Sequence, residues 1–270
     1  MKRILVVSGS RADWGPLEWP VKVLQEEAEF SVSVLKIWGA SPDLAYVETL
    51  GAIARERPDL MLILGDRYEI LAAALAAHLQ RVPIAHIAGG DVSEGSYDDA
   101  MRDCISRMAT LHFVTSDAAW DRLTRLGYAN VHMVGSPGVD YIRHADWRGP
   151  RPITESYVVV AYYPETIDGT VDLEAVYAAI AGRRAVWCSP NQDRGAERIP
   201  AGEIFEHAEF LNLLAHCEEF IGNSSALLYE APFLGIKTRM IGKRQRGRVQ
   251  PWGDGLASER IREALKAWTP

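Results

Sequence analysis

The sequence has only three cysteines, Cys104, Cys188 and Cys217, and no two of them form a CxxC pair. Neither a zinc ribbon nor a disulfide framework is supported, because both need paired, closely spaced cysteines. All three lie in apolar or helical patterns, which is typical of buried core thiols. No metal site is predicted either, since His86 has no second ligand at a suitable spacing and is better explained as a core histidine.

Long hydrophobic runs are also absent. The N-terminal stretch MKRILVVSGSRADWG has a charged start and an apolar run that is too short to span a membrane. No small-residue cleavage site follows this run, so it does not resemble a signal peptide. We therefore expect a buried first strand in a cytoplasmic protein with no membrane partner.

The sequence lacks an excess of positive charge. It contains 29 Lys and Arg against 36 Asp and Glu, which gives a formal net charge of −7. This balance argues against a nucleic-acid partner, since such proteins need a basic surface. Local basic clusters in an acidic protein predict small anionic ligands instead. A dinucleotide is weakly supported, because no GxGxxG fingerprint follows the first strand.

What is present is a regular alternation of short apolar runs and amphipathic stretches. The predicted strands of the first half are 4–10, 31–37, 60–65, 83–88, 111–116 and 131–135. The predicted helices between them include 17–27, 45–57, 67–79 and 118–126. Strands that are apolar on both faces and alternate with helices indicate a parallel sheet covered on both sides.

A second series of the same kind follows a segment rich in Pro, Gly and charge, residues 136–156, which is the best candidate for a domain boundary. We predict an α/β protein with two Rossmann-like domains, parallel sheets and a cleft between them. The N-terminal domain is expected at 1–145 and the C-terminal domain at 146–255. Residues 256–270 are expected to form a final helix that reaches back to the first domain. In such folds ligands bind at the carboxyl ends of the strands.

Two strand ends carry acidic residues. LILGDRYE places Asp66 and Arg67 at the end of a very apolar strand, where Asp66 is either a helix N-cap or a cleft residue. HIAGGDVSEGSYDDAMR follows another strand and offers Asp91 and Asp98 within eight residues. These carboxylates are candidates for proton transfer. The structural alternative is a Gly-Gly turn before a helix whose acidic first turn favours the macrodipole.

A third stretch, IGNSSALLYEAPFLGIKTRMIGKRQRGR, combines small hydroxyl side chains at the start of an apolar helix with a basic turn after the next strand. Ser and Asn are good N-caps, and the amides of a first helical turn bind anions. The capped helix alone does not require a ligand. Together with the basic turn, Ser224, Ser225 and Arg244 indicate a phosphate site.

These motifs resemble, in the same order, those of the hydrolysing UDP-N-acetylglucosamine 2-epimerases, most of all the sialic-acid-pathway branch. The matching stretches are GSRADWGPL, LGDRYEILAAALAA, HIAGGD, EGSYDDAMR, HFVTS, VGSPGVD, YPET, IGNSSALLYEAPFLG, IGKRQRGR and GDGLASERI. The resemblance covers nearly the whole chain. It implies the GT-B-like fold, with a nucleotide-sugar bound between two Rossmann-like domains.

The resemblance also implies a reaction and a set of residues. Family members need no dissociable redox cofactor: a base removes the C2 proton as UDP leaves C1, and water then adds to the glycal. By this resemblance Asp66, Asp91 and Asp98 are the acid/base candidates. The residues implied to bind the UDP-sugar substrate are Arg11, Arg67, Asn191, Ser224, Ser225, Glu230 and Arg244. Homodimers occur in the family, and the sequence does not decide whether this chain forms one.

Several positions depart from the family pattern. Tyr163 replaces a histidine of the catalytic site, and we expect it to support the leaving diphosphate. Ala88 and Leu227 stand where relatives have an acid, a histidine or a glycine, and the stretch from Leu35 to Leu50 is shorter than usual. The leading interpretation is a hydrolysing 2-epimerase. The alternatives are a glycosyltransferase that uses the same donor pocket and a UDP-sugar binder without turnover.

Overall fold

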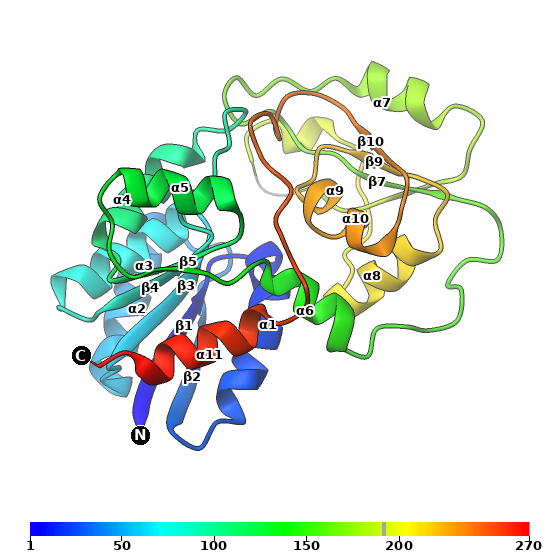
Figure 1. Ribbon diagram of the computed structural model, residues 1–270. Helices are drawn as coiled ribbons and strands as arrows, with labels where there is room; N and C mark the ends of the chain where they lie inside the picture. The colour runs from blue at the N-terminus through cyan, green and yellow to red at the C-terminus, as the bar shows by residue number, and fades with distance from the viewer. Residues whose placement is uncertain (191–192, 270) are drawn as a thin grey trace. The chain divides into compact units, whose positions relative to one another are not determined.

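The computed structural model describes residues 1–190 and 193–269, and it divides the chain into two α/β units. Unit 1 consists of Met1–Val92, Asp98–Arg143 and the stretch from Pro251 to the C-terminal end. Unit 2 consists of Ser93–Tyr97 and His144–Gln250. The sequence had placed the boundary at 145/146, and it gave no sign that a five-residue segment of the first half belongs to unit 2. Figure 1 shows the course of the chain.

Unit 1 is built on a six-stranded parallel sheet with the strand order β2-β1-β3-β4-β5-β6. Its strands are β1 (Lys2–Ser8), β2 (Phe30–Lys36), β3 (Leu60–Leu64), β4 (Ile84–Ile87), β5 (Leu111–Val114) and β6 (Val131–Met133). Its helices are α1 (Arg11–Gln25), α2 (Pro42–Glu56), α3 (Tyr68–Leu79), α4 (Asp98–Met108), α5 (Asp117–Arg125), α6 (Pro137–His144) and α11 (Ala257–Ala267).

Both faces of this sheet are apolar and covered by helices, as the sequence predicted. Ile4 and Val6 of β1 pack in one core with side chains of α1 and α11, whereas Leu5 and Val7 pack in a second core with α2, α3 and α4. Alternate side chains of a strand point to opposite faces, so a strand of consecutive apolar residues fits a sheet that is buried twice.

The C-terminal helix α11 is part of unit 1 and lies beside α1 (Figure 1). Asp140 of α6 holds its N-terminus: the carboxylate accepts hydrogen bonds from the backbone N–H of Ala257 at 3.1 Å and of Ser258 at 2.5 Å. The first N–H groups of a helix have no partner within the helix, so this buried carboxylate satisfies them. Lys2 donates to the carbonyl oxygens of Leu265 and Lys266 at the other end.

Unit 2 has a four-stranded parallel sheet with the order β10-β9-β7-β8. Its strands are β7 (Val158–Ala161), β8 (Ala185–Trp187), β9 (Phe220–Gly222) and β10 (Thr238–Met240). Its helices are α7 (Leu173–Ile180), the 3₁₀ helix η1 (Ala196–Arg198), α8 (His207–Ala215), α9 (Ala226–Tyr229) and α10 (Ala231–Leu234). In the described part of the chain, no helix is both long and apolar enough to cross a bilayer.

Candidate functional site

The sheet of unit 1 has a switch point, a place where the connections from neighbouring strands run towards opposite edges of the sheet. β1 lies between β2 and β3, so the chain leaves β1 towards one edge of the sheet and continues from β3 towards the other. Ligands of open α/β sheets bind at such a switch point, beyond the carboxyl ends of the strands. Arg11 and Asp13 follow β1, and Asp66 and Arg67 follow β3. The topology therefore supports the strand ends that the sequence singled out.

Arg102 of α4 gathers the candidate acids of unit 1. Its side chain is only 2% exposed and forms ion pairs with Asp66 and Asp99. The same guanidinium donates to the backbone carbonyl of Asp91 at 2.8 Å. The Asp91 carboxylate in turn accepts a hydrogen bond from the Thr115 hydroxyl at 3.1 Å. Residues from the ends of β3, β4 and β5 thus meet around one cation, which the sequence motifs did not reveal.

Asp98 is the first residue of α4, next to Asp99. Of the predicted acids, Asp66 pairs with Arg102, Asp91 accepts a hydrogen bond from it through its backbone carbonyl, and Asp98 lies on the same helix as Arg102. The two predicted arginines of this unit are placed differently. Arg67 pairs with the buried Glu69, with 3.2 Å between Nε and Oε2, and Arg11 is exposed at the start of α1.

Asp13 is a further acid that the sequence analysis did not single out. It is 8% exposed, and its Oδ2 is buried without a hydrogen-bond partner among the described residues. Burial raises the pKa of Asp13 to about 6, although a hydrogen bond with Ser10 and the charge of Arg67 act in the opposite direction. The signal in the sequence is an acid one turn into the helix after the first strand, which is too common to stand out.

The strand order of unit 2 repeats the switch point, here between β7 and β9. Asn223, directly after β9, is fully buried and connects the two strand ends. Its Oδ1 accepts from the backbone N–H of Tyr163 at 2.7 Å, and its Nδ2 donates to the Tyr163 carbonyl at 2.8 Å. Gln245 donates to the Asn223 carbonyl at 2.7 Å. Asn223 therefore holds Tyr163 and the turn after β10 in fixed positions.

Tyr163 and Arg244 lie together. The Arg244 Cζ is 5.5 Å from the centre of the Tyr163 ring, and its guanidinium donates to the Pro164 carbonyl at 2.6 Å. A second nitrogen of Arg244 pairs with Asp193 at 2.9 Å. Burial raises the pKa of Tyr163 to about 12, so its hydroxyl stays protonated at neutral pH and is able to donate a hydrogen bond.

The predicted helix after Asn223 consists of two short pieces. α9 begins at Ala226, and the N–H groups of Asn223 and Ser224 both donate to the Ala161 carbonyl. The Ser224 hydroxyl accepts from the Ala226 N–H at 3.3 Å. The hydroxyls of Ser224 and Ser225, both partly exposed, are therefore better placed than the first amides to contact an anion. Asn191 lies outside the described residues.

Glu230 stands between α9 and α10, and its Oε2 is buried without a hydrogen-bond partner in the described ranges. Burial raises the pKa of Glu230 to about 7. Glu230 and Ser224 both act on the pKa of Tyr163, so these side chains lie near one another in unit 2. An unpartnered buried carboxyl group lowers stability, and it is typical of a side chain that is kept for a ligand.

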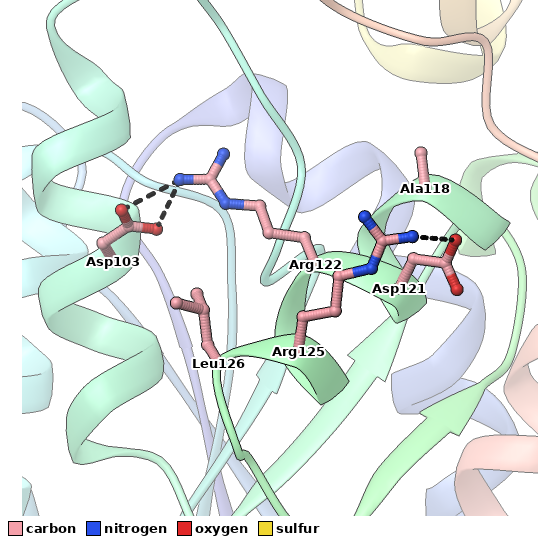
Figure 2. A pocket seen from close by; sticks show the side chains of 6 residues that line it. All are labelled: Asp103, Ala118, Asp121, Arg122, Arg125 and Leu126. Carbon is pink, nitrogen blue, oxygen red and sulfur yellow. Dashed lines mark hydrogen bonds and ion pairs between the residues drawn. The ribbon is translucent and has the colours of Figure 1, made fainter.

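A separate hollow lies between α4 and α5 of unit 1, with a volume of about 560 Å³. Its lining residues are Asp103, Ala118, Asp121, Arg122, Arg125 and Leu126. Figure 2 shows that Arg122 reaches Asp103 and that Arg125 pairs with Asp121. We assign no function to it, because its arginines are already neutralised by its aspartates. Within the described ranges, no group of three or more His, Cys, Asp and Glu side chains is arranged to hold a metal ion.

Comparison with protein families gives one match over most of the chain. The family model described as UDP-N-acetylglucosamine 2-epimerase matches residues 44–266. The chain belongs to this family. The match spans the ends of β3, β4, β7 and β9 and therefore includes the candidate acids and the polar network around Asn223.

Several named proteins are similar to this chain over nearly its whole length. A UDP-N-acetylglucosamine 2-epimerase of Neisseria meningitidis is 27% identical over 312 positions, which cover 92% of this chain and 81% of the relative. A UDP-N,N'-diacetylbacillosamine 2-epimerase (hydrolyzing) of Legionella pneumophila is 27% identical and covers 91% and 82%. The polysialic acid biosynthesis protein P7 of Escherichia coli is 26% identical and covers 93% and 81%.

Solved structures of 2-epimerases share the fold. S. aureus MnaA, determined with UDP, has a TM-score of 0.82 at 18% identity and covers 98% of this chain and 96% of its own. The Neisseria meningitidis enzyme bound to UDP-GlcNAc has a TM-score of 0.77 at 15% identity and covers 98% and 99%. The predicted α/β, GT-B-like class with two Rossmann-like domains is confirmed.

Three residues were expected to differ from the 2-epimerase pattern, and the structure places each in a different setting. Tyr163 lies in the polar network described above. Leu227 is 2% exposed and packs in the core of unit 2. Ala88 directly follows β4 and has a positive φ of 63°, a conformation that residues with a side chain seldom adopt.

We predict that Arg102→Met lowers the free energy of unfolding by about 3–5 kcal/mol, because it leaves the Asp66 and Asp99 carboxylates without their buried counter-charge. Adding Asp66→Asn should restore part of this loss. The measurement is urea denaturation. Arg125→Met is the control, since its pair with Asp121 is exposed and contributes about 0–1 kcal/mol. Equal effects of the two arginine variants would contradict the buried cluster.

A second prediction concerns pH. The pKa of Glu230 is about 7 in the folded chain, above the ordinary value of 4.5, so its ionisation opposes folding increasingly as pH rises from 4.5 to 7 and fully above 7. Glu230→Gln should therefore match the parent protein near pH 4.5 and exceed its stability at pH 8 by up to about 3 kcal/mol. Thermal unfolding at both pH values measures this, with the exposed Glu174→Gln as control. A pH-independent difference would show that Glu230 is not buried as an acid.

Proposed function

We propose that the protein is a hydrolysing 2-epimerase that converts a UDP-linked 2-acetamido sugar into UDP and the free 2-epimeric sugar. Family membership supports the class of reaction. The observation that carries the proposal is the convergence of Asp66 and Asp91 on Arg102 at the carboxyl ends of β3 and β4. Epimerisation at C2 requires a proton to leave one face of the sugar and another to arrive at the opposite face, which calls for more than one carboxyl group.

In the proposed reaction one carboxylate among Asp66, Asp91 and Asp98 takes the C2 proton. The C2 electron pair forms a C1–C2 double bond while the C1–O bond to UDP breaks and its electrons remain on the diphosphate. Water then adds to the glycal: its oxygen bonds to C1, the proton that the water releases goes to a carboxylate, and a protonated carboxyl group delivers hydrogen to C2 from the other face. Atoms and charges balance without a redox cofactor, and we propose none.

Unit 2 is proposed to hold the nucleotide. Arg244, Ser224 and Ser225 would bind the diphosphate, and the unpartnered Glu230 carboxyl group would accept hydrogen bonds from the ribose hydroxyls. Tyr163, which stays protonated, would donate one hydrogen bond to the leaving diphosphate where a histidine would supply a positive charge. Arg11, Arg67 and Asn191 complete the proposed set of binding residues.

The sugar is proposed to be N-acetylglucosamine or a diacetamido relative, and the product would then be N-acetylmannosamine or its analogue. Relatives named as hydrolysing enzymes for diacetylbacillosamine nucleotides, together with the polysialic acid protein P7, support this range and a place in sialic-acid synthesis. A homodimer stays a prediction that the single chain does not test.

The direct test is incubation with UDP-N-acetylglucosamine in deuterated water, followed by mass spectrometry and NMR. We expect UDP and free N-acetylmannosamine that carries deuterium at C2, and a large loss of rate in Asp66→Asn. UDP-N-acetylmannosamine without UDP release would indicate a non-hydrolysing epimerase. UDP that forms only with an added acceptor would indicate a transferase, and binding without turnover would indicate a sensor.

A further prediction concerns nucleotide affinity. Arg244→Ala should weaken UDP binding, because it removes a charged partner worth about 1.5–3 kcal/mol. Asp193→Asn should strengthen it, because Asp193 competes with the phosphates for the Arg244 guanidinium. Lys243→Ala, in the same turn, is the control for a simple change of net charge. Calorimetric titration with UDP measures all three, and unchanged affinity in Arg244→Ala would place the diphosphate elsewhere.

A further inference from the structure

The segment Ser93–Tyr97, here called the clasp, lies between two candidate acids in the sequence but belongs to unit 2. The chain leaves unit 1 after Val92, forms the clasp and re-enters unit 1 at Asp98. Asp91 is two residues before the clasp, and Asp98 follows it directly. The clasp therefore connects two residues of unit 1, Asp91 and Asp98, to a segment that packs within unit 2.

Hydrogen bonds and an ion pair fasten the clasp to the rest of unit 2. The Gly95 N–H donates to the Arg246 carbonyl at 3.2 Å. The Thr166 hydroxyl donates to the Ser96 hydroxyl at 3.0 Å, and Ser96 is only 8% exposed. Glu94 forms an ion pair with Arg246 at 3.4 Å, although both side chains are largely exposed and the pair contributes little. The backbone bond and the buried hydroxyl pair are the firm attachments.

The contact leaves no room for a side chain at Gly95. A Cβ there would lie 1.8 Å from the Lys243 carbonyl oxygen, far inside the van der Waals limit. On the opposite side a Cβ at Gly247 would lie 2.5 Å from the Glu94 Cγ. Gly95 thus allows the clasp backbone to touch the Lys243–Arg244 backbone, Gly247 leaves space for the Glu94 side chain, and the clasp fits directly against the turn from Lys243 to Gly247.

The same turn carries Arg244, the proposed diphosphate ligand. It is fixed to the segment after β7, because the Lys243 N–H donates to Glu165 Oε1 at 2.8 Å and Arg244 donates to the Pro164 carbonyl at 2.6 Å. Clasp, turn and Pro164–Thr166 are therefore one packed assembly. A ligand that moves or orders the turn acts on the clasp as well.

We propose that the clasp positions Asp91 and Asp98 for the reaction by tying their loop to the turn that binds the diphosphate. This inference rests on the proposed function. Two residues span at most about 7 Å, so Asp91 follows any displacement of the clasp closely. An error of about 1 Å in the placement of a catalytic group lowers the rate by about 100-fold, whereas nucleotide contacts made within unit 2 are unaffected.

The test compares turnover with nucleotide affinity in Gly95→Ala, Ser96→Ala and Thr166→Val. We expect kcat to fall by up to about tenfold in Ser96→Ala and Thr166→Val while the Kd for UDP changes less than about threefold. Gly95→Ala should lower both kcat and UDP affinity, because its Cβ would meet the Lys243 and Arg244 backbone. Gly51→Ala is the matched control, because a Cβ at Gly51 meets nothing within 4 Å. The hydroxyl variants carry the test if Gly95→Ala does not fold.

Hydrogen exchange provides a readout that does not depend on turnover. UDP should slow amide exchange in residues 91–98 of the parent protein, and Ser96→Ala and Thr166→Val should weaken this effect while they still bind UDP. Unchanged kcat in both hydroxyl variants, or a parallel loss of kcat and UDP affinity in them, would overturn the positioning role. A parent protein that binds UDP and protects residues 91–98 but releases no sugar would contradict the proposed function and leave the coupling established.

Discussion

Burying a guanidinium costs several kcal/mol unless opposite charges and hydrogen-bond acceptors surround it, and Arg102 is buried almost completely. Its acceptors are the carboxylates of Asp66, after β3, and Asp99, within α4, and the backbone carbonyl of Asp91, after β4. The fold of unit 1 is therefore complete only when these segments converge. The contacts that folding requires are the ones that the proposed proton-transfer chemistry would use.

The two units use the same sheet topology in different ways. In both, the first strand of the series lies between the second and the third, so the switch point at which open α/β sheets bind ligands falls at the carboxyl ends of β1 and β3 and again of β7 and β9. Unit 1 lines this position with carboxylates around one cation. Unit 2 lines it with neutral groups, the Asn223 amide and the Tyr163 hydroxyl, beside Arg244. The carboxylates of unit 1 would suit the proposed proton transfer. The neutral groups beside Arg244 in unit 2 would suit the binding of a diphosphate that stays ionised.

Most of the fold was predictable from the sequence, and most of the site's internal connections were not. Strands such as β3 and β7 are continuous apolar runs that only a doubly covered sheet accommodates, so their existence followed from the pattern alone, whereas their order in the sheet did not. α6 was hidden in a segment rich in Pro and Gly, which is also typical of linkers. Asp66 was singled out because it follows such a run. Arg102 was not, because two of its partners, Asp66 and Asp91, are 36 and 11 residues away and only the packed sheet brings them near.

The same limit applies to unit 2. The motif around Ser224 was recognisable as a strand followed by hydroxyl side chains, yet the neighbouring Asn223 carries the structural connections. The Asn223 side-chain amide bonds to the backbone of Tyr163, which follows β7 and lies 60 residues earlier in the chain. Nothing local in the sequence indicates this contact. Side chains that bind backbone across strands become visible only when the register is known.

Neither unit is a continuous stretch of chain, because the clasp is separated in sequence from the rest of unit 2 and α11 returns to unit 1 after unit 2 is complete. A fragment of residues 144–250 would expose the Arg246 carbonyl and the surface that Gly95 covers, and residues 1–143 alone would lose the helix whose N-terminus Asp140 holds. A single break in the chain therefore does not separate unit 1 from unit 2. Recombination with other nucleotide-binding domains would have to exchange several segments at once, which favours inheritance of the whole chain as one piece.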